Sequence, residues 1–192
     1  MITIADSALF CAAALCTGKE QTRPYLHGVY IQPAATGGGL LLTATDGHIL
    51  FHGHDPNGTA ERAAIVVPDK GKLPAPWAKG GAITIDLAQG IMRHTTGGLT
   101  AGCREDKGTF PYYPNVIPRE FSGEVAQFNP DLLARFGDIA KILTKGAFPG
   151  IQHNGDSPAL VTFARRDCFG VVMPIRAKAV PDLSMPALPS AA

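Results

Sequence analysis

The sequence predicts an α+β fold built from three consecutive units, each with the order strand, helix and three strands. Its 22 glycines and 16 prolines are spread along the chain, which favours many short elements joined by turns over a helical bundle. Short segments of alternating apolar and polar residues, separated by turn residues, are typical of strands. Two other segments carry a helix-capping residue before an apolar run.

The first unit, residues 1–60, is expected to contain a helix near its start and a hairpin near its end. Asp6 or Ser7 can cap a helix over Ala8–Thr17. The Asp46–Gly47 pair lies between two apolar runs, where it favours a tight hairpin turn. The strands that we expect in this unit are Met1–Ile4, Gly28–Gln32, Leu40–Ala44 and His48–His52.

The second unit, residues 63–118, repeats this order without a clear helix. Lys70–Lys79 lies where a helix is expected, but Pro74 and Pro76 interrupt it. An aromatic and proline-rich segment, Phe110–Pro118, ends the unit. The expected strands are Ala64–Val67, Ala82–Leu87, Gly90–His94 and Leu99–Arg104.

The third unit, residues 119–176, has the clearest helix of the chain. Asn129 can cap it, Pro130 suits its first position, and apolar residues recur at helical spacing as far as Leu143. Residues 177–192 are small and proline-rich, and we expect a flexible tail. The expected strands are Val125–Phe128, Gly150–His153, Ala159–Phe163 and Phe169–Pro174.

Composition limits the classes of protein to which the chain can belong. The formal net charge of +1 over 192 residues gives no general attraction to nucleic acid, so any contact with DNA must be a local patch. Four cysteines without a CxxC pair predict no disulfides and fit a reducing cytoplasm. We expect no signal peptide and no membrane span, since no apolar run reaches roughly 20 residues. These features predict a cytoplasmic location.

Signals for catalysis or metal binding are weak. No GxSxG nucleophile motif and no phosphate-binding loop occurs, so we expect neither an enzyme nor a bound cofactor. His52 and His54 would share one strand face near His48, and a metal site there is an alternative. No Cys, Asp or Glu at suitable spacing completes such a site, and turn and surface histidines are the favoured interpretation.

Three segments resemble the bacterial DNA sliding clamp, the beta subunit of DNA polymerase III. TRPYLHGVYI and LLTATDGHIL, within Thr22–Leu50, are similar to an aromatic-Leu-x-Gly strand followed by ATDGHRL in the family. FPYYPNVIP, Phe110–Pro118, is similar to FPDYxxVIP, and VVMPIR, Val171–Arg176, is similar to the MPMR at the family's C-terminus. The sequence departs from these patterns at Ile49, Tyr112 and Pro24, where the family has Arg, Asp and an aromatic residue.

The resemblance implies the DNA-clamp fold, with antiparallel sheets outside and helices inside. Residues 1–118 resemble the family's middle domain, and residues 119–176 resemble the second half of its last domain. The chain therefore resembles a shortened clamp with three half-units. A family ring holds twelve half-units, so four such chains would supply them, and we expect a homo-oligomer. An unpaired half-unit also leaves strand edges that self-association would cover.

In the family, a groove beside the C-terminal strand receives short peptides of DNA polymerase and of other replication and repair proteins. Apolar walls suit leucine or aromatic anchors, and methionine adapts to varied ligands. The alternative is that Val171 and Met173 only pack inside a core. The groove residues that the resemblance implies are Leu26, Thr45, Gly47, His48, Leu50 and Pro118 on one side, and Val171, Val172, Met173, Pro174, Ile175 and Arg176 on the other.

Family rings also line their hole with basic residues that contact double-stranded DNA without reading its sequence. Arg23 and Tyr25 fall in a loop that approaches DNA in the family. Ordinary solvated charge is the alternative for each lysine. The DNA-facing candidates are Lys19, Arg23, Tyr25, Lys70, Lys72, Lys79, Arg135, Lys141 and Lys145.

We therefore expect a sliding-clamp-like processivity factor or adaptor. The alternative is a stand-alone decoy that captures clamp-binding peptides without encircling DNA. Asp182–Met185, in the tail, loosely resembles the clamp-binding peptides of family partners and is a candidate for docking into a groove of its own chain or of a neighbour.

Overall fold

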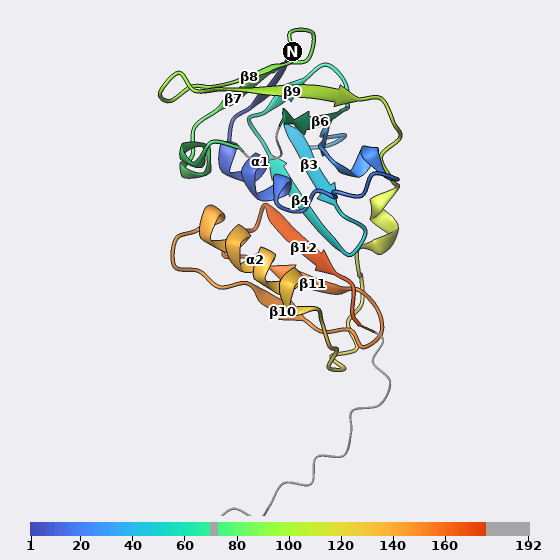
Figure 1. The fold of residues 1–192 in the computed structure, drawn as a ribbon. Coiled ribbons are helices and arrows are strands. Elements are labelled where there is room, and N and C mark those ends of the chain that lie inside the picture. The colour runs from blue at the N-terminus through green and yellow to red at the C-terminus, as the bar shows by residue number, and fades with distance from the viewer. Residues whose placement is uncertain (70–72, 176–192) are drawn as a thin grey trace, which may run out of the picture.

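The computed structural model describes residues 1–69 and 73–175 and has an α+β architecture (Figure 1). Twelve strands of these residues form a continuous antiparallel series in the order β10-β11-β12-β4-β3-β2-β6-β9-β8-β7-β1-β5. The strands are β1 (Ile2–Ile4), β2 (Val29–Pro33), β3 (Leu40–Thr45), β4 (Ile49–Asp55), β5 (Thr59–Ala60), β6 (Ala64–Pro68), β7 (Ile83–Asp86), β8 (Ile91–His94), β9 (Thr100–Asp106), β10 (Gly150–Gln152), β11 (Ala159–Thr162) and β12 (Cys168–Val172). The helices are α1 (Ser7–Ala14), α2 (Pro130–Leu143) and the 3₁₀ helices η1 (Pro24–Leu26), η3 (Ala75–Lys79) and η4 (Tyr113–Val116).

Strand β9 belongs to two sheets. Its first residues, from Thr100 to Gly102, pair with β8, whereas Cys103 to Asp106 pair with β6. A Cβ at Gly102 would stand 2.2 Å from the Asp69 carboxylate, so a larger residue there would require the Asp69 side chain to move. The chain thereby continues from one sheet into the next.

The third unit extends the sheet of the first. Strand β12 pairs with β4, and this pairing sets Val171 opposite Leu50. Helix α2 lies close against β12, because a Cβ on Gly170 would stand 2.4 Å from the Phe136 ring. Segments that are distant in sequence thus form neighbouring strands.

The two α-helices lie side by side on one face of the sheet (Figure 1). Asp6 caps α1 by accepting a hydrogen bond from the Ala8 amide at 2.9 Å, and Asn129 caps α2 in the same way. Helix α1 packs against β2, β3 and β4, and also against η3 and α2. One hydrophobic core, with residues from all three units, includes Phe10, Phe51, Trp77 and Phe136.

The structure confirms the predicted α+β class and most of the expected elements. Helix α2 has the expected bounds, and η3 replaces an α-helix where Pro74 and Pro76 interrupt the sequence. The strand expected at Val125–Phe128 is wrong, since this segment contributes only an isolated bridge between Gln127 and Ile175. Helix α1 ends at Ala14 rather than Thr17, because the chain then tightens into 3₁₀-type hydrogen bonds. Residues 177–192 lie outside the described part of the chain.

Candidate functional site

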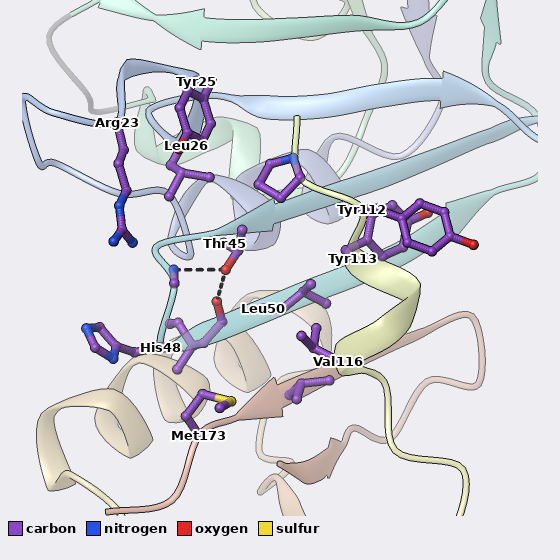
Figure 2. A pocket seen from close by; sticks show the side chains of 14 residues that line it. Arg23, Tyr25, Leu26, Thr45, His48, Leu50, Tyr112, Tyr113, Val116 and Met173 are labelled. Atoms are coloured by element: carbon purple, nitrogen blue, oxygen red, sulfur yellow. Dashed lines mark hydrogen bonds between the residues drawn. The ribbon is translucent and has the colours of Figure 1, made fainter. Parts of the chain in front are cut away.

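A pocket of about 190 Å³ lies where four segments that are distant in sequence meet (Figure 2). We call it the apolar pocket, because most of its lining is carbon. The segments are the loop with η1, the β3–β4 turn together with β4, the end of β12, and the segment around η4. Its lining residues are Arg23, Tyr25, Leu26, Thr45, Gly47, His48, Ile49, Leu50, Pro111, Tyr112, Tyr113, Val116, Val171 and Met173.

The β3–β4 turn forms the polar end of the pocket. Figure 2 shows that the Thr45 hydroxyl donates to the Ile49 carbonyl at 2.6 Å and accepts from the Gly47 amide at 3.0 Å. Asp46 Oδ1 accepts from the amides of His48 and Ile49 at 2.8 and 2.9 Å. Gly47 has φ of +96°, a conformation that disfavours residues with a side chain. These bonds hold His48 at the rim of the pocket.

Leu26, Leu50 and Val171 form the floor of the pocket. Each is less than 5% exposed, because η1 and the β4–β12 pair bring them together. Met173 continues from β12, where its amide donates to the His48 carbonyl at 2.9 Å, and its side chain is 39% exposed. The floor is therefore buried, while the Met173 side chain remains available for contacts.

The segment around η4 forms the opposite wall. Phe110 stacks on Tyr30 with ring centroids 4.8 Å apart, and Tyr113 packs against His52 at 5.3 Å. The Tyr113 hydroxyl also accepts a hydrogen bond of 3.2 Å from Gln32. These contacts anchor the segment to the sheet and leave Tyr112 75% exposed at the pocket.

The pocket combines a carbon-lined floor with a few polar groups at its rim. Such a surface can take the leucine or aromatic side chains of an extended peptide. Met173 can adapt to anchors of different shape. Arg23 and His48 can orient polar or acidic groups of the same ligand. The arrangement is suited to binding.

Seven of the predicted groove residues line this pocket: Leu26, Thr45, Gly47, His48, Leu50, Val171 and Met173. Val172 does not line the pocket, because it points to the opposite face of β12 and is fully buried in the core. Pro118, Pro174 and Ile175 do not line the pocket, and Ile175 instead bridges to Gln127. Arg176 lies outside the described residues.

Four of the nine predicted DNA-facing residues are exposed lysines in or shortly after helices. Lys19, Lys79, Lys141 and Lys145 are exposed, and Lys141 pairs with Asp138 at 2.8 Å. Arg23 and Tyr25 line the apolar pocket, and Arg135 is turned toward Asp46 and the end of α1. Lys70 and Lys72 lie outside the described residues.

The sequence reasoning missed the wall beside η4, which supplies Pro111, Tyr112, Tyr113 and Val116. The aromatic and proline-rich composition of this segment was visible, but a short 3₁₀ helix leaves no periodic pattern that predicts which side chains face the pocket. Ile49 was also missed, although it lies within the predicted hairpin.

The histidines of β4 have structural partners. His52 accepts or donates a 2.9 Å hydrogen bond with Thr43 and packs between Tyr113 and Phe169. Burial lowers the pKa of His52 to about 4, with a smaller effect of His54 in the same direction. Among residues 1–69 and 73–175, no three His, Cys, Asp or Glu side chains are grouped to hold a metal ion. The four cysteines are unpaired and buried.

No helix of the described segments has the length and hydropathy needed to cross a bilayer.

No family model matches the chain. Comparison with individual proteins, however, finds sliding clamps. A beta sliding clamp of Pseudomonas aeruginosa is 31% identical over 141 residues, which are 70% of this chain and 37% of that protein. A beta sliding clamp of Caulobacter vibrioides is 29% identical over 126 residues, 62% of this chain and 34% of that protein. The chain thus spans about a third of the length of these curated relatives.

Solved structures extend the similarity to most of the fold. The DnaN sliding clamp of Bartonella birtlesii, solved with bound griselimycin, aligns with a TM-score of 0.63 and 18% identity over 89% of this chain and 64% of that one. The DNA polymerase III subunit beta of Pseudomonas aeruginosa aligns with a TM-score of 0.60 and 20% identity over 92% of this chain and 67% of that one. The chain is therefore a relative of the bacterial beta sliding clamps and has the sliding-clamp fold.

Proposed function

We propose that the protein is a clamp-like adaptor that binds DNA polymerase or other replication and repair proteins through the apolar pocket. The observation that carries the proposal is the meeting of the β3–β4 turn, the end of β12 and the η4 segment around one apolar cavity. A short extended peptide would place an apolar anchor over Leu50 and Val171. Its polar groups would lie near His48 and Arg23.

A carboxylate placed in the pocket tests this proposal. Val116 lines the pocket and is 39% exposed, so Val116→Asp should fold normally. We expect it to weaken binding of the fluorescein-labelled peptide Gln-Leu-Ser-Leu-Phe by about tenfold or more, because a bound peptide would desolvate the new charge. Fluorescence anisotropy measures the affinity.

The matched control is Val125→Asp, which makes the same substitution at an 81% exposed valine outside the pocket. We expect this variant to bind the peptide as the natural chain does. Equal peptide affinities of the Val116→Asp and Val125→Asp variants would exclude the pocket as the binding site.

We also propose that several copies enclose double-stranded DNA without sequence specificity. The described strand series ends in two edges, β10 and β5, and exposed edges favour pairing with another chain. Exposed lysines lie in or shortly after helices, with Lys79 in η3, Lys141 in α2, and Lys19 and Lys145 after α1 and α2. A closed assembly should remain on circular DNA and slide off linear DNA, and light scattering of the same sample should show an oligomer.

The same experiment separates the adaptor from the decoy. Peptide binding by a monomer that no circular DNA retains would favour a decoy that occupies clamp-binding motifs. Retention on circular DNA, lost after linearisation, would favour the enclosing ring. Neither outcome depends on the identity of the polymerase.

A further inference from the structure

Arg135 closes the C-terminal end of α1 although it belongs to α2. Its Nε donates to the Leu15 carbonyl at 3.0 Å, and its Nη2 donates to the carbonyls of Leu15 and Thr17 at 2.8 and 3.3 Å. The last carbonyls of a helix have no partner within the helix, and a cation at that end is favourable. One side chain therefore joins the two helices.

The same guanidinium reaches the turn of the apolar pocket. Its Nη1 pairs with Asp46 Oδ2, while Asp46 Oδ1 accepts from the amides of His48 and Ile49. The two side chains are only 30% and 14% exposed, which shields the pair from water. Asp46 thus connects Arg135 directly to the residues that form the polar end of the pocket.

A second connection holds His48 from the other side. The Met173 amide donates to the His48 carbonyl at 2.9 Å, and Met173 continues from β12. Phe136, the residue after Arg135, packs onto Gly170 of β12. These contacts link α2 to His48 by two routes. Helix α2 packs on β12, and Met173 after β12 donates to the His48 carbonyl. Arg135 of α2 also pairs with Asp46, which accepts from the His48 amide.

We infer that Arg135 is a positioning residue of the apolar pocket, an inference that rests on the proposed peptide binding. The resemblance to sliding clamps suggested instead that this side chain faces DNA. Its guanidinium is turned to Asp46, Leu15 and Thr17. Arginine suits the role because its planar fork serves a carboxylate and two carbonyls at once, whereas the single ammonium of lysine cannot reach all three in this geometry.

Three single variants test the inference. Arg135→Lys keeps the charge, Arg135→Met removes it, and Asp46→Asn keeps an oxygen for the amides but loses the ion pair. We expect each to weaken binding of the Gln-Leu-Ser-Leu-Phe probe by about fivefold or more, since the turn that carries His48 would lose its link to α2. Arg166→Met removes an exposed arginine at the other end of β12 and should bind within about twofold of the natural chain.

Amide hydrogen exchange distinguishes positioning from a general loss of stability. In Arg135→Met, exchange at His48 and Ile49 should accelerate by about tenfold, while the core amides of Ile31 and Val66 keep their rates. The double variant of Arg135→Met and Asp46→Asn should bind the probe no more weakly than the worse single variant, because the two residues form one link. Acceleration of all four amides alike would show a global effect and overturn the inference.

The exchange measurement also separates this inference from the proposed function. If the natural chain does not bind the probe, the peptide-binding proposal fails, and the turn amides still decide whether Arg135 positions His48. Unchanged exchange at His48 and Ile49 in Arg135→Met would overturn the positioning role. If the natural chain binds the probe but Arg135→Met binds it equally well, Arg135 does not position the pocket for binding.

Discussion

The floor and the rim of the apolar pocket differ in how far they belong to the fold. Leu26, Leu50 and Val171 in the floor are less than 5% exposed and connect η1, β4 and β12. Tyr112, Val116 and Met173 at the rim are at least 39% exposed. Under the proposed function, the buried floor would contribute to both stability and binding, whereas the exposed rim would contribute to binding alone. Substitutions should separate these two contributions.

The largest effect should come from the floor. Leu50→Ala removes a buried side chain that lies opposite Val171 at the junction of the first and third units. We expect it to lower the free energy of unfolding by about 2–5 kcal/mol, because the transfer free energy is lost and a cavity remains. Urea unfolding followed by circular dichroism measures the change. A loss below about 1 kcal/mol would show that the floor contributes little to the fold.

A smaller effect should come from His52, which connects the floor strand to the wall. Burial lowers the pKa of His52 to about 4, so the folded protein favours the neutral ring. The unfolded chain binds a proton near pH 6.5, and the contribution to stability is therefore present above pH 6.5 and is lost as the pH falls toward 4. Between pH 7 and pH 5 we expect a loss of about 2 kcal/mol from this group.

His52→Gln removes the titration but can still bond to Thr43. Unfolding at several pH values should therefore show a shallower decline for this variant than for the natural chain. Parallel declines would mean that His52 titrates alike in the folded and unfolded states.

The smallest change in stability should come from the rim. Tyr112→Ser removes an aromatic side chain that is 75% exposed, so the free energy of unfolding should stay within about 0.5 kcal/mol. Peptide affinity should nevertheless fall several-fold, because aromatic residues are frequent anchors of binding surfaces. Phe148→Ser, at a 90% exposed aromatic residue outside the pocket, is the control. Unchanged peptide affinity in Tyr112→Ser would exclude this part of the rim from the contact.

Local patterns predicted most of the fold. The Asp46–Gly47 hairpin, the capped helix α2 and the interrupted helix at η3 follow from turn residues, caps and prolines. Strand alternation also carried information that the site prediction did not use. If Val171 and Met173 line the pocket, Val172 between them must face the other side.

The rest of the site depends on packing between units. The partner of Arg135 is Asp46, and no spacing within α2 or within the β3–β4 turn indicates that these two side chains meet. The exposed side chains of η4 are similarly placed by the stacking of Phe110 on Tyr30 and of Tyr113 on His52. Such contacts are determined by tertiary packing, and the local sequence contains no pattern that predicts them.

The pairing of β4 with β12 has a consequence for biosynthesis. Contacts between residues that are distant along the chain form slowly, because a large loop must close before they are gained. During translation, the segment that contains Leu50 leaves the ribosome long before the segment that contains Val171. A chain that has not yet reached β12 consequently lacks the Val171 side of the apolar pocket, and the proposed peptide binding requires β12 to be translated and folded onto β4.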